Sequence, residues 1–211
     1  MSYYKLYPNY KNSGIEWLGD VPGHWTVNRL RHSLSASLSY GANEATESDD
    51  PAHPRFIRIT DLDDSGGLRD NSFKSLIPEA AKQYMLQHED ILLARSGATV
   101  GKSFIYKQDM GAACYAGYLI RARFNSKKLK AQYFRFCTQS SYYWNFIGEN
   151  NIQATIQNVS AEKYMNLWLA FPSVAEQEKI VNYLDSETAR IEDLIAKKPA
   201  SSPCCAKSAK L

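Results

Sequence analysis

Residues 90–106, DILLARSGATVGKSFIY, most constrain what this chain can fold into. Ile91-Leu92-Leu93-Ala94 is a short apolar run of the length of one buried strand. Residues 102–106 alternate between the two faces of a second strand. The seven residues between them contain Gly97 and Gly101, which permit a tight turn. The stretch therefore predicts a β-hairpin whose loop carries a cation at each shoulder, Arg95 and Lys102.

The same loop has a superficial likeness to a phosphate-binding P-loop. That motif needs a glycine, four residues and then Gly-Lys-Ser/Thr, followed by a helix. Here only three residues separate Gly97 from Gly101, and Ser96 stands where the first glycine should be. Strand-like residues follow Ser103, so no helix N-terminus would face a phosphate. A basic hairpin loop fits DNA contact better than nucleotide binding, and a plain surface hairpin remains the alternative.

Charge is distributed unevenly along the chain, although the net charge is only +3. Residues 39–90 hold five Lys/Arg and eleven Asp/Glu, a balance of −6. Residues 91–148 hold nine Lys/Arg and one acid, a balance of +8. This asymmetry predicts that the cations of the middle third share one surface facing phosphates, with the acidic part turned away. Solvated charge runs, which are common, are the alternative.

Size and composition indicate one domain with an appendage. The chain has 211 residues, 44% hydrophobic and 22% charged, as in an ordinary globular protein. No apolar run reaches the length of a membrane span, and the N-terminal residues lack a signal peptide's apolar core. We therefore expect a cytoplasmic protein with no membrane contact. The cysteines lack metal-ligand spacing, and Cys114 and Cys137 are expected to be buried thiols.

Patterns along the chain predict further elements. The tryptophan-containing segment 14–25 is expected to dock onto the body of the domain. Apolar residues at 27, 30, 34 and 38 predict a helix or turn. The other expected elements are a strand at 55–60, a short helix at 78–87, one bent strand or two at 112–124, a helix over 127–147 and a last strand at 166–171.

Three smaller features have two interpretations each. The carboxylates of 61–70 invite a calcium site, but their spacing does not match an EF-hand loop, so a solvated turn is favoured. In Tyr142-Tyr143-Trp144, helical spacing places Trp144 in the core and leaves Tyr142 as the ring that could stack on bases. The amide-rich stretch 150–160 could contact DNA or cap turns.

A different pattern begins at residue 173. Ser173 and Glu176 form a capping-box sequence that opens a helix. Behind it, apolar residues alternate spacings of three and four over about two heptads, as in a short coiled-coil seam. We predict a helix over 173–198 after a domain at 1–172, with a disordered tail at 199–211. The predicted helix-interface residues are Val181, Leu184, Thr188, Ile191 and Ile195.

Several of these stretches, taken in order, resemble the specificity subunit of type I restriction-modification enzymes. The segments that carry the resemblance are GIEWLGDVPGHW, RFIRITDL, DILLARSGATVGK and SAEKYMNLWLAFPSVAEQEKIVNYLDSETARIEDLIAKK, and together they span nearly all of residues 14–198. The resemblance implies a target-recognition domain followed by a helix. In this family two such domains each read half of a split DNA sequence, and two antiparallel helices fix the gap between the halves.

The resemblance also implies a non-catalytic subunit without a cofactor or metal. Its expected partners are double-stranded DNA, a modification subunit that methylates adenine using S-adenosylmethionine, and an ATP-dependent restriction subunit. In agreement, the sequence contains no NPPY or DPPY methyltransferase tetrad. One recognition domain and one helix correspond to a half-length subunit, which could restore two-fold geometry as a homodimer through its helix. A truncated subunit that binds proteins without reading DNA is the alternative.

Taken together, the sequence predicts an α/β (α+β) fold, a curved mixed β-sheet recognition domain with a projecting C-terminal helix. The predicted DNA-binding residues are Arg95, Ser96, Gly97, Thr99, Lys102, Arg121, Arg123, Lys127, Lys128 and Tyr142.

Overall fold

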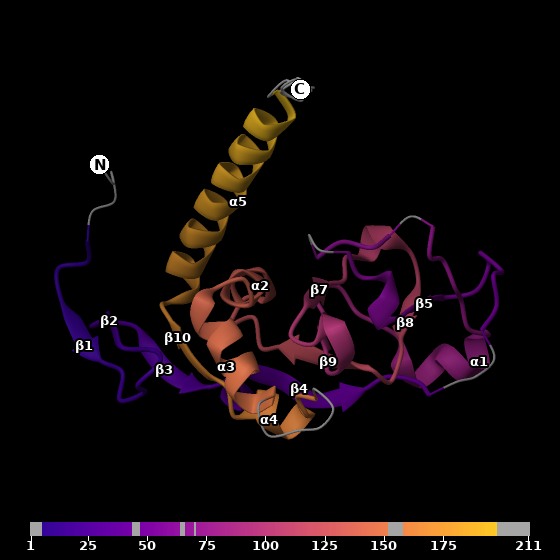
Figure 1. Ribbon diagram of the computed structural model, residues 1–211, viewed down its shortest axis with the longest axis horizontal. Coiled ribbons are helices and arrows are strands. Elements are labelled where there is room, and N and C mark those ends of the chain that lie inside the picture. Colours follow the sequence, from indigo (N-terminus) through magenta and orange to yellow (C-terminus); the bar gives the residue numbers. More distant parts are fainter. Residues whose placement is uncertain (1–5, 44–46, 64–65, 70, 152–157, 198–211) are drawn as a thin grey trace, which may run out of the picture.

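The computed structural model describes residues 6–43, 47–63, 66–69, 71–151 and 158–197. It is a mixed α/β domain from which one long helix projects (Figure 1), so the predicted fold class is confirmed. The strands are β1 (Tyr10–Asn12), β2 (Asp20–Pro22), β3 (Thr26–Arg29), β4 (Leu34–Tyr40), β5 (Arg55–Ile57), β6 (Ile91–Ala94), β7 (Ser103–Ile105), β8 (Ala113–Tyr115), β9 (Leu119–Phe124) and β10 (Trp168–Phe171). The helices are α1 (Pro78–Ala81), α2 (Ala131–Cys137), α3 (Ser141–Asn151), α4 (Ala161–Met165) and α5 (Val174–Lys197).

A four-stranded antiparallel sheet, ordered β4-β9-β6-β7, forms the centre of the domain. The predicted hairpin is confirmed as β6 and β7, with Leu92 opposite Phe104. The remaining strands pair in three two-stranded sheets: β1 with β2, β3 with β10, and β5 with β8, the last pair parallel. The strands are thus divided among several small sheets.

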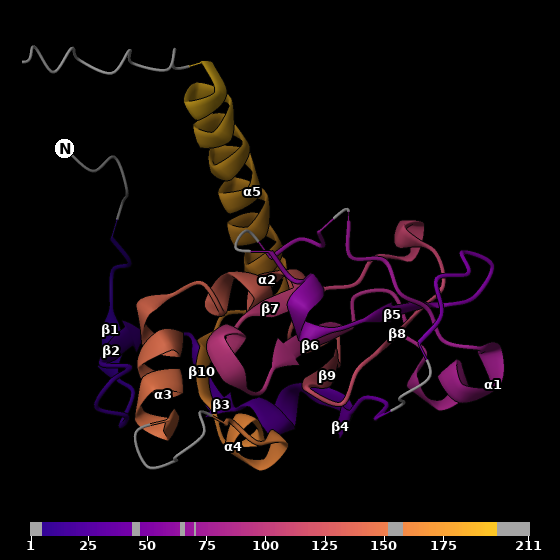
Figure 2. The ribbon, with the colours of Figure 1, turned by 45° about the vertical axis from the view of Figure 1, so that its right-hand side comes forward.

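Both faces of the central sheet are covered, which explains the uninterrupted apolar run of β6. Ile91 and Leu93 point into one core, shared with α2, α3, α4 and β10. Leu92 and Ala94 point into a second core, shared with β5, β8 and the loops around them. Figure 2 shows α2, α3 and α4 toward one end of the domain and β5, β8 and α1 at the other.

The segment predicted as a helix or turn over 27–38 is mostly strand. It forms β3, a 3-10 turn at Leu30–Ser33, and β4. The sequence of β4, LSASLSY, also alternates with a period of two, as a strand does. Pairing with β9 selects the strand over the helix. Two register shifts along this pairing bend the strand.

Other local expectations agree with the structure. The region 112–124 forms two strands, β8 and β9, and 78–87 begins with helix α1. The tryptophan-containing N-terminal segment docks as expected: Trp17 stacks on Tyr142 with ring centroids 5.9 Å apart, and Trp25 meets Tyr133 edge-on at 6.4 Å. In the described part of the chain, no helix combines the length and the apolar character that crossing a bilayer requires.

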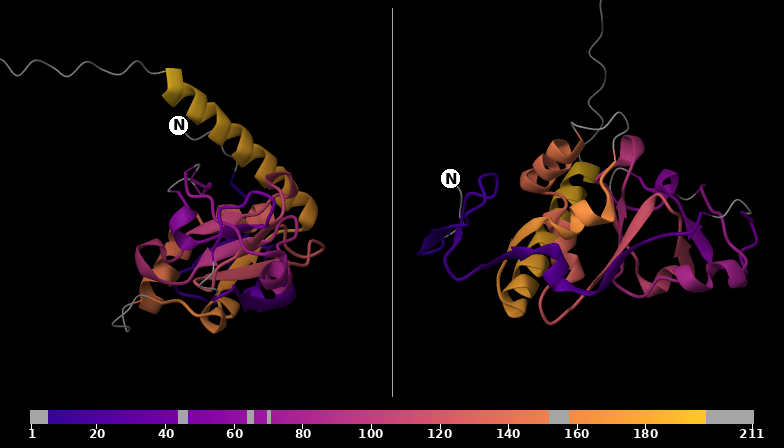
Figure 3. Two further views of the ribbon diagram at one scale, coloured as in Figure 1. Left: turned by 90° about the vertical axis from the view of Figure 1, so that its right-hand side faces the viewer. Right: turned by 90° about the horizontal axis from the view of Figure 1, so that it is seen from below.

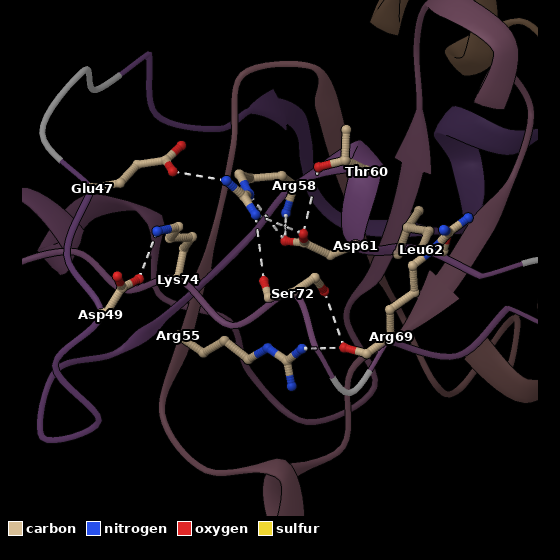
Figure 4. A network of polar contacts seen from close by, with 10 residues as sticks. All are labelled: Glu47, Asp49, Arg55, Arg58, Thr60, Asp61, Leu62, Arg69, Ser72 and Lys74. Atoms are coloured by element: carbon tan, nitrogen blue, oxygen red, sulfur yellow. Dashed lines mark hydrogen bonds and ion pairs between the residues drawn. The ribbon is translucent and has the colours of Figure 1, made fainter.

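The turn at 61–70 is not simply solvated, because Asp61 is fully buried. Its carboxylate accepts hydrogen bonds from the Arg58 side chain, at 3.0 Å from Nη2 and 3.3 Å from Nε. Arg58 also reaches Glu47 at 2.7 Å, and Lys74 pairs with Asp49 at 2.7 Å (Figure 4). Some of the acidic residues of this stretch are therefore paired with cations of the same stretch.

The two cysteines in the described residues, Cys114 and Cys137, are buried and free, as predicted. Burial raises the pKa of each thiol to about 12. At pH 8 both are therefore protonated and poorly nucleophilic. In a chain carrying Cys204→Ser and Cys205→Ser, we expect a thiol reagent to modify neither cysteine until denaturant unfolds the domain. Rapid modification of either in buffer alone would contradict this packing.

Candidate nucleic-acid interface

Arg95 lies directly after β6, at the end of the central sheet where four separate chain segments meet. Its guanidinium carbon sits 4.7 Å from the centre of the Tyr40 ring, at the end of β4. Its backbone N–H donates to the carbonyl of Tyr118 at 3.0 Å, and its own carbonyl accepts from Val159 at 2.8 Å. Ser96 forms an antiparallel bridge with Asn158. We call Tyr40, Arg95, Ser96, Tyr118 and Asn158 the Arg95 edge.

The chemistry of the Arg95 edge suits a nucleic acid. Tyr40 and Tyr118 are large aromatic residues left 41% and 60% exposed, which is unusual for rings that could pack in the core. The Tyr40 ring orients the guanidinium by a cation–π contact. A guanidinium held in this way can bind a phosphate, or guanine O6 and N7, with two parallel hydrogen bonds.

Six buried side-chain polar atoms of the described residues lack a hydrogen-bond partner, and three of them belong to this loop or to Asn158. Among the described residues, Arg95 Nε, Thr99 Oγ1 and Asn158 Oδ1 are buried and make no hydrogen bond. Leaving such a group unsatisfied costs about 1–3 kcal/mol each. Because these atoms are buried, they do not themselves form a contact surface for a ligand.

A concavity of about 790 Å³ adjoins the Arg95 edge at Tyr118. Its lining includes the small residues Ala42, Ala116 and Gly117, and the backbone N–H of Gly117 donates to the carbonyl of Ala42 at 2.7 Å. A Cβ at Gly117 would displace the side chain of Asn43. The lining residues are Ala42, Asn43, Glu47, Phe56, Arg58, Ile59, Thr60, Ala116, Gly117 and Tyr118.

Arg58, at the wall of this concavity, is held by its own neighbours. The hydrogen bond to Asp61 is the main cause that raises the pKa of Arg58 above its ordinary value, with Glu47 adding to it. The ion pairs of Figure 4 therefore fix the wall and leave Arg58 with little charge to offer a ligand. Recognition in the concavity would fall to Asn43, Thr60 and the exposed Tyr118 ring.

The hairpin loop itself has the geometry that its glycines predicted. Gly97 and Gly101 adopt φ of +73° and +85°. Gly97 is exposed at the tip, whereas Gly101 packs against α3 and its carbonyl accepts a 2.8 Å hydrogen bond from the buried Tyr143 hydroxyl. The loop is thus supported by α3 at Gly101 and exposed to solvent at Gly97. Lys102 lies on its other shoulder, beside Asp63, Gln139 and Trp144 around a hollow of about 200 Å³.

The predicted single basic surface is divided in the structure. Arg123 is bound to fully buried Asp90 by two hydrogen bonds of 2.7 Å, from Nε and Nη2. The hydrogen bond to Asp90 is the main cause that raises the pKa of Arg123. Its charge is used inside the domain, so Arg123 does not belong to the proposed interface.

The other predicted cations of the middle third also lie apart from Arg95. Lys127 and Lys128 are exposed in the turn that follows β9, and Lys128 Nζ donates to the carbonyl of His32 at 3.0 Å. Since Arg95 is next to the start of β9, the six-residue strand places about 20 Å between them. Arg121 sits partway along, 6.0 Å from the centre of the Tyr115 ring. These residues remain predictions for phosphate contact, at a separate place from Arg95.

The expected exposure of two aromatic residues is wrong. Trp144 is 44% exposed, whereas Tyr142 is partly buried and stacks on Trp17. Burial raises the pKa of the Tyr142 hydroxyl far above its ordinary value. The predicted helix over 127–147 is in fact α2 and α3, and the break at 138–140 changes which side faces the core. We therefore remove Tyr142 from the proposed interface.

Tyr40, Tyr118 and Asn43 were not among the predicted site residues. Each lies at the end of a strand or in a short turn, where no periodicity marks it. Tyr118 had a local signal, since an aromatic residue in the tight turn between two strands cannot easily reach the core. Tyr40 had none, because its role depends on Arg95, 55 positions away in the sequence.

Comparison with known proteins gives a consistent picture. A family model described as "Type I restriction modification DNA specificity domain" matches residues 43–201. A curated relative, the type I restriction enzyme StySPI specificity subunit of Salmonella potsdam, is 30% identical over 127 residues, covering 59% of this chain and 26% of the relative.

Solved structures share the fold at low sequence identity. The HsdS subunit from Thermoanaerobacter tengcongensis has a TM-score of 0.62 and 16% identity, covering 90% of this chain and 43% of that one. The type I restriction-modification S subunit from M. genitalium has a TM-score of 0.57 and 16% identity, covering 92% and 43%. A chain from a study of type I R-M complex assembly has a TM-score of 0.63 and 20% identity, covering 83% and 41%. The chain thus spans about a quarter of the curated relative and about two fifths of the solved chains.

Proposed function

Because the chain belongs to the type I restriction modification DNA specificity family, we propose that it recognises duplex DNA in a sequence-specific manner through the Arg95 edge. The observation that carries this proposal is that the Arg95 guanidinium lies over the exposed Tyr40 ring, while the Arg95 backbone bonds Tyr118, whose exposed ring lines the concavity. Specificity subunits are non-catalytic, and we assign no catalytic residue to this chain. Residues 1–172 act as the recognition domain and 173–198 as a helix that connects it to other parts of an assembly.

The residues of the Arg95 edge and of the adjoining hairpin loop have different roles. Arg95 reads a guanine or grips a phosphate, while Tyr40 and Tyr118 pack against sugars or exposed bases. Ser96, Gly97 and Thr99 bring backbone and hydroxyl donors to the loop, and Lys102 supplies charge at its far shoulder. This is a smaller interface than the sequence predicted. It relies on a few oriented groups more than on a broad basic field.

We further propose that the chain works with a modification subunit that methylates adenine and a restriction subunit that cuts DNA, in the cytoplasm, where DNA is accessible. The distal half of α5 suits a role in assembly. Ile191, Leu194 and Ile195 are 50%, 54% and 68% exposed, and Figure 3 shows the C-terminal part of α5 extending away from the domain. Two copies paired through Leu184, Thr188, Ile191 and Ile195 would present two recognition domains, as a half-length subunit requires. Val181, which the sequence placed in this seam, is buried in the core of its own domain, so we leave it out of the proposed pairing.

Selection from a library of duplexes with a random central region tests the proposal. Purified protein is expected to enrich duplexes that share a short base sequence over several rounds at physiological salt. Duplexes with the same bases in scrambled order are expected to be depleted. Tyr118→Ala should relax the enriched sequence at one or two positions, reducing discrimination by about 1–3 kcal/mol at each of them. Failure to retain any duplex, with retention of a modification subunit, would instead indicate a module that binds only proteins.

A further inference from the structure

The first turn of α5 contains two adjacent side chains, Glu176 and Gln177, that bind different parts of the domain. Glu176 faces the N-terminal segment, and Gln177 faces the turn that leads into α2. Adjacent side chains on a helix point about 100° apart, so Glu176 and Gln177 bind the domain on two different sides of α5. A helix held on two sides at its base cannot swing about either contact alone.

Glu176 makes three hydrogen bonds with the N-terminal segment. The Tyr7 hydroxyl donates at 2.8 Å and Trp25 Nε1 at 3.2 Å, both to Oε1, and His24 Nε2 lies 2.9 Å from Oε2. Burial raises the pKa of this carboxyl, but the bonds from Tyr7, His24 and Trp25 lower it more, so the net pKa is below its ordinary value. The carboxylate predicted to complete a capping box with Ser173 is therefore used to hold residues far away in sequence.

Gln177 is fully buried and satisfies three backbone groups. Its Oε1 accepts from the backbone N–H of Lys130 at 2.9 Å, and its Nε2 donates to the carbonyls of Lys128 and Pro172, both at 2.9 Å. A buried amide that bonds the backbone on both sides fixes position more strictly than apolar packing does. Gln177 thus joins the start of α5 to the start of α2.

The contacts of α5 with the domain continue beyond this first pair of residues, and Glu178 pairs with Lys130 at 2.8 Å. Val181 is buried and Asp185 pairs with Arg135 at 3.3 Å, but every residue from 188 to 197 is exposed. From Glu176 to Ile195 the helix extends about 28 Å at 1.5 Å per residue. A swing of about 10° at the base would move the far end by about 5 Å, which exceeds the roughly 3.4 Å rise of one base pair.

We infer that Glu176 and Gln177 are positioning residues that fix the direction of α5 relative to the recognition domain. Resting on the proposed function, this anchor would set the gap between two DNA half-sites, because a loose helix could not hold that gap to one base pair. The N-terminal segment, residues 7–25, then holds α5 in its direction through Tyr7, His24 and Trp25, which all bind Glu176.

Distance measurement between spin labels tests the anchor without DNA. Labels are introduced by Glu162→Cys on α4 and Glu192→Cys on α5, both exposed sites, in the Cys204→Ser, Cys205→Ser background. The parent is expected to give one narrow distance distribution. Glu176→Ala and Gln177→Ala are each expected to broaden it to roughly twice that width, because local contacts at the base hold the far end. Tyr7→Phe is expected to broaden it less.

Glu187→Ala is the matched control, since Glu187 pairs with Arg190 of the same helix at 2.7 Å, and it should leave the width unchanged. Combining Tyr7→Phe with Glu176→Ala should broaden the distribution no more than Glu176→Ala alone, because both remove the same hydrogen bond. Far-UV circular dichroism confirms that each variant is folded. An unchanged width in both Glu176→Ala and Gln177→Ala would overturn the inference. If the library selection enriches no sequence while these widths change, the proposed function fails and the anchor stands.

Discussion

Replacing Asp90 by alanine is expected to lower the free energy of unfolding by about 3–5 kcal/mol, the largest effect we predict for one side chain. Asp90 is fully buried directly before β6, and it accepts two bonds from Arg123 and a 2.8 Å bond from the backbone N–H of Gln87. Its removal leaves the guanidinium of Arg123, only a quarter exposed, without its counter-charge. Urea denaturation followed by circular dichroism measures the decrease.

A matched control separates the buried pair from an ordinary surface pair. Asp185 also pairs with an arginine, Arg135, but it is about half exposed. Asp185→Ala should therefore cost less than about 1 kcal/mol. Adding Arg123→Met to Asp90→Ala should recover part of the stability, because the unpaired charge is then gone. Equal destabilisation by Asp90→Ala and Asp185→Ala would show that Asp90 has no special structural role.

The second large effect is expected at Gly101. This residue has φ of +85°, and a Cβ there would lie 2.9 Å from Trp144 Cζ3 and 3.1 Å from Ile147. Gly101→Ala should therefore cost about 2–4 kcal/mol, combining backbone strain with overlap against α3. It should also displace the loop that carries Arg95 and weaken DNA binding.

Gly97 provides the comparison, since its φ of +73° is similar but a Cβ there meets open space. Gly97→Ala is expected to cost only the backbone strain, about 1–2 kcal/mol. Thermal or urea unfolding of the two variants gives the difference. Greater destabilisation by Gly97→Ala than by Gly101→Ala would mean that the loop is not braced on α3 as described.

Local features of the fold could be predicted from sequence, and distant ones could not. The hairpin of β6 and β7 was predictable because both strands and the turn lie within 17 consecutive residues with clear glycine and apolar signals. The pairing of β4 with β9 joins residues 80 to 90 positions apart, and nothing local specifies it. The strand pattern of β4 therefore competed with a helical spacing, and only the distant partner decides between them.

The candidate site illustrates the same limit. Arg95 could be chosen because it stands beside a glycine loop, but Arg123 looked equally suitable until Asp90 was found beside it, 33 positions away. The exposures of Trp144 and Tyr142 were predicted the wrong way round because one continuous helix was assumed. The break at 138–140 separates α2 from α3 and changes which residues of the second helix face the core. Charge counting found the basic region but could not tell a structural cation from an available one.

A titration of labelled duplex DNA at several salt concentrations tests most directly whether the Arg95 edge binds DNA. We expect Arg95→Ala to weaken binding by about 1–3 kcal/mol, and to reduce the log-log salt slope by about 0.9 if Arg95 grips a phosphate. Arg95→Lys should keep the slope and lose base discrimination, since it retains the charge without the planar fork. Arg135→Ala, on α2 and paired with Asp185, is the control and should bind as the parent does. Parental affinity and slope for Arg95→Ala, or equal weakening by Arg135→Ala, would contradict a DNA-binding role for the Arg95 edge.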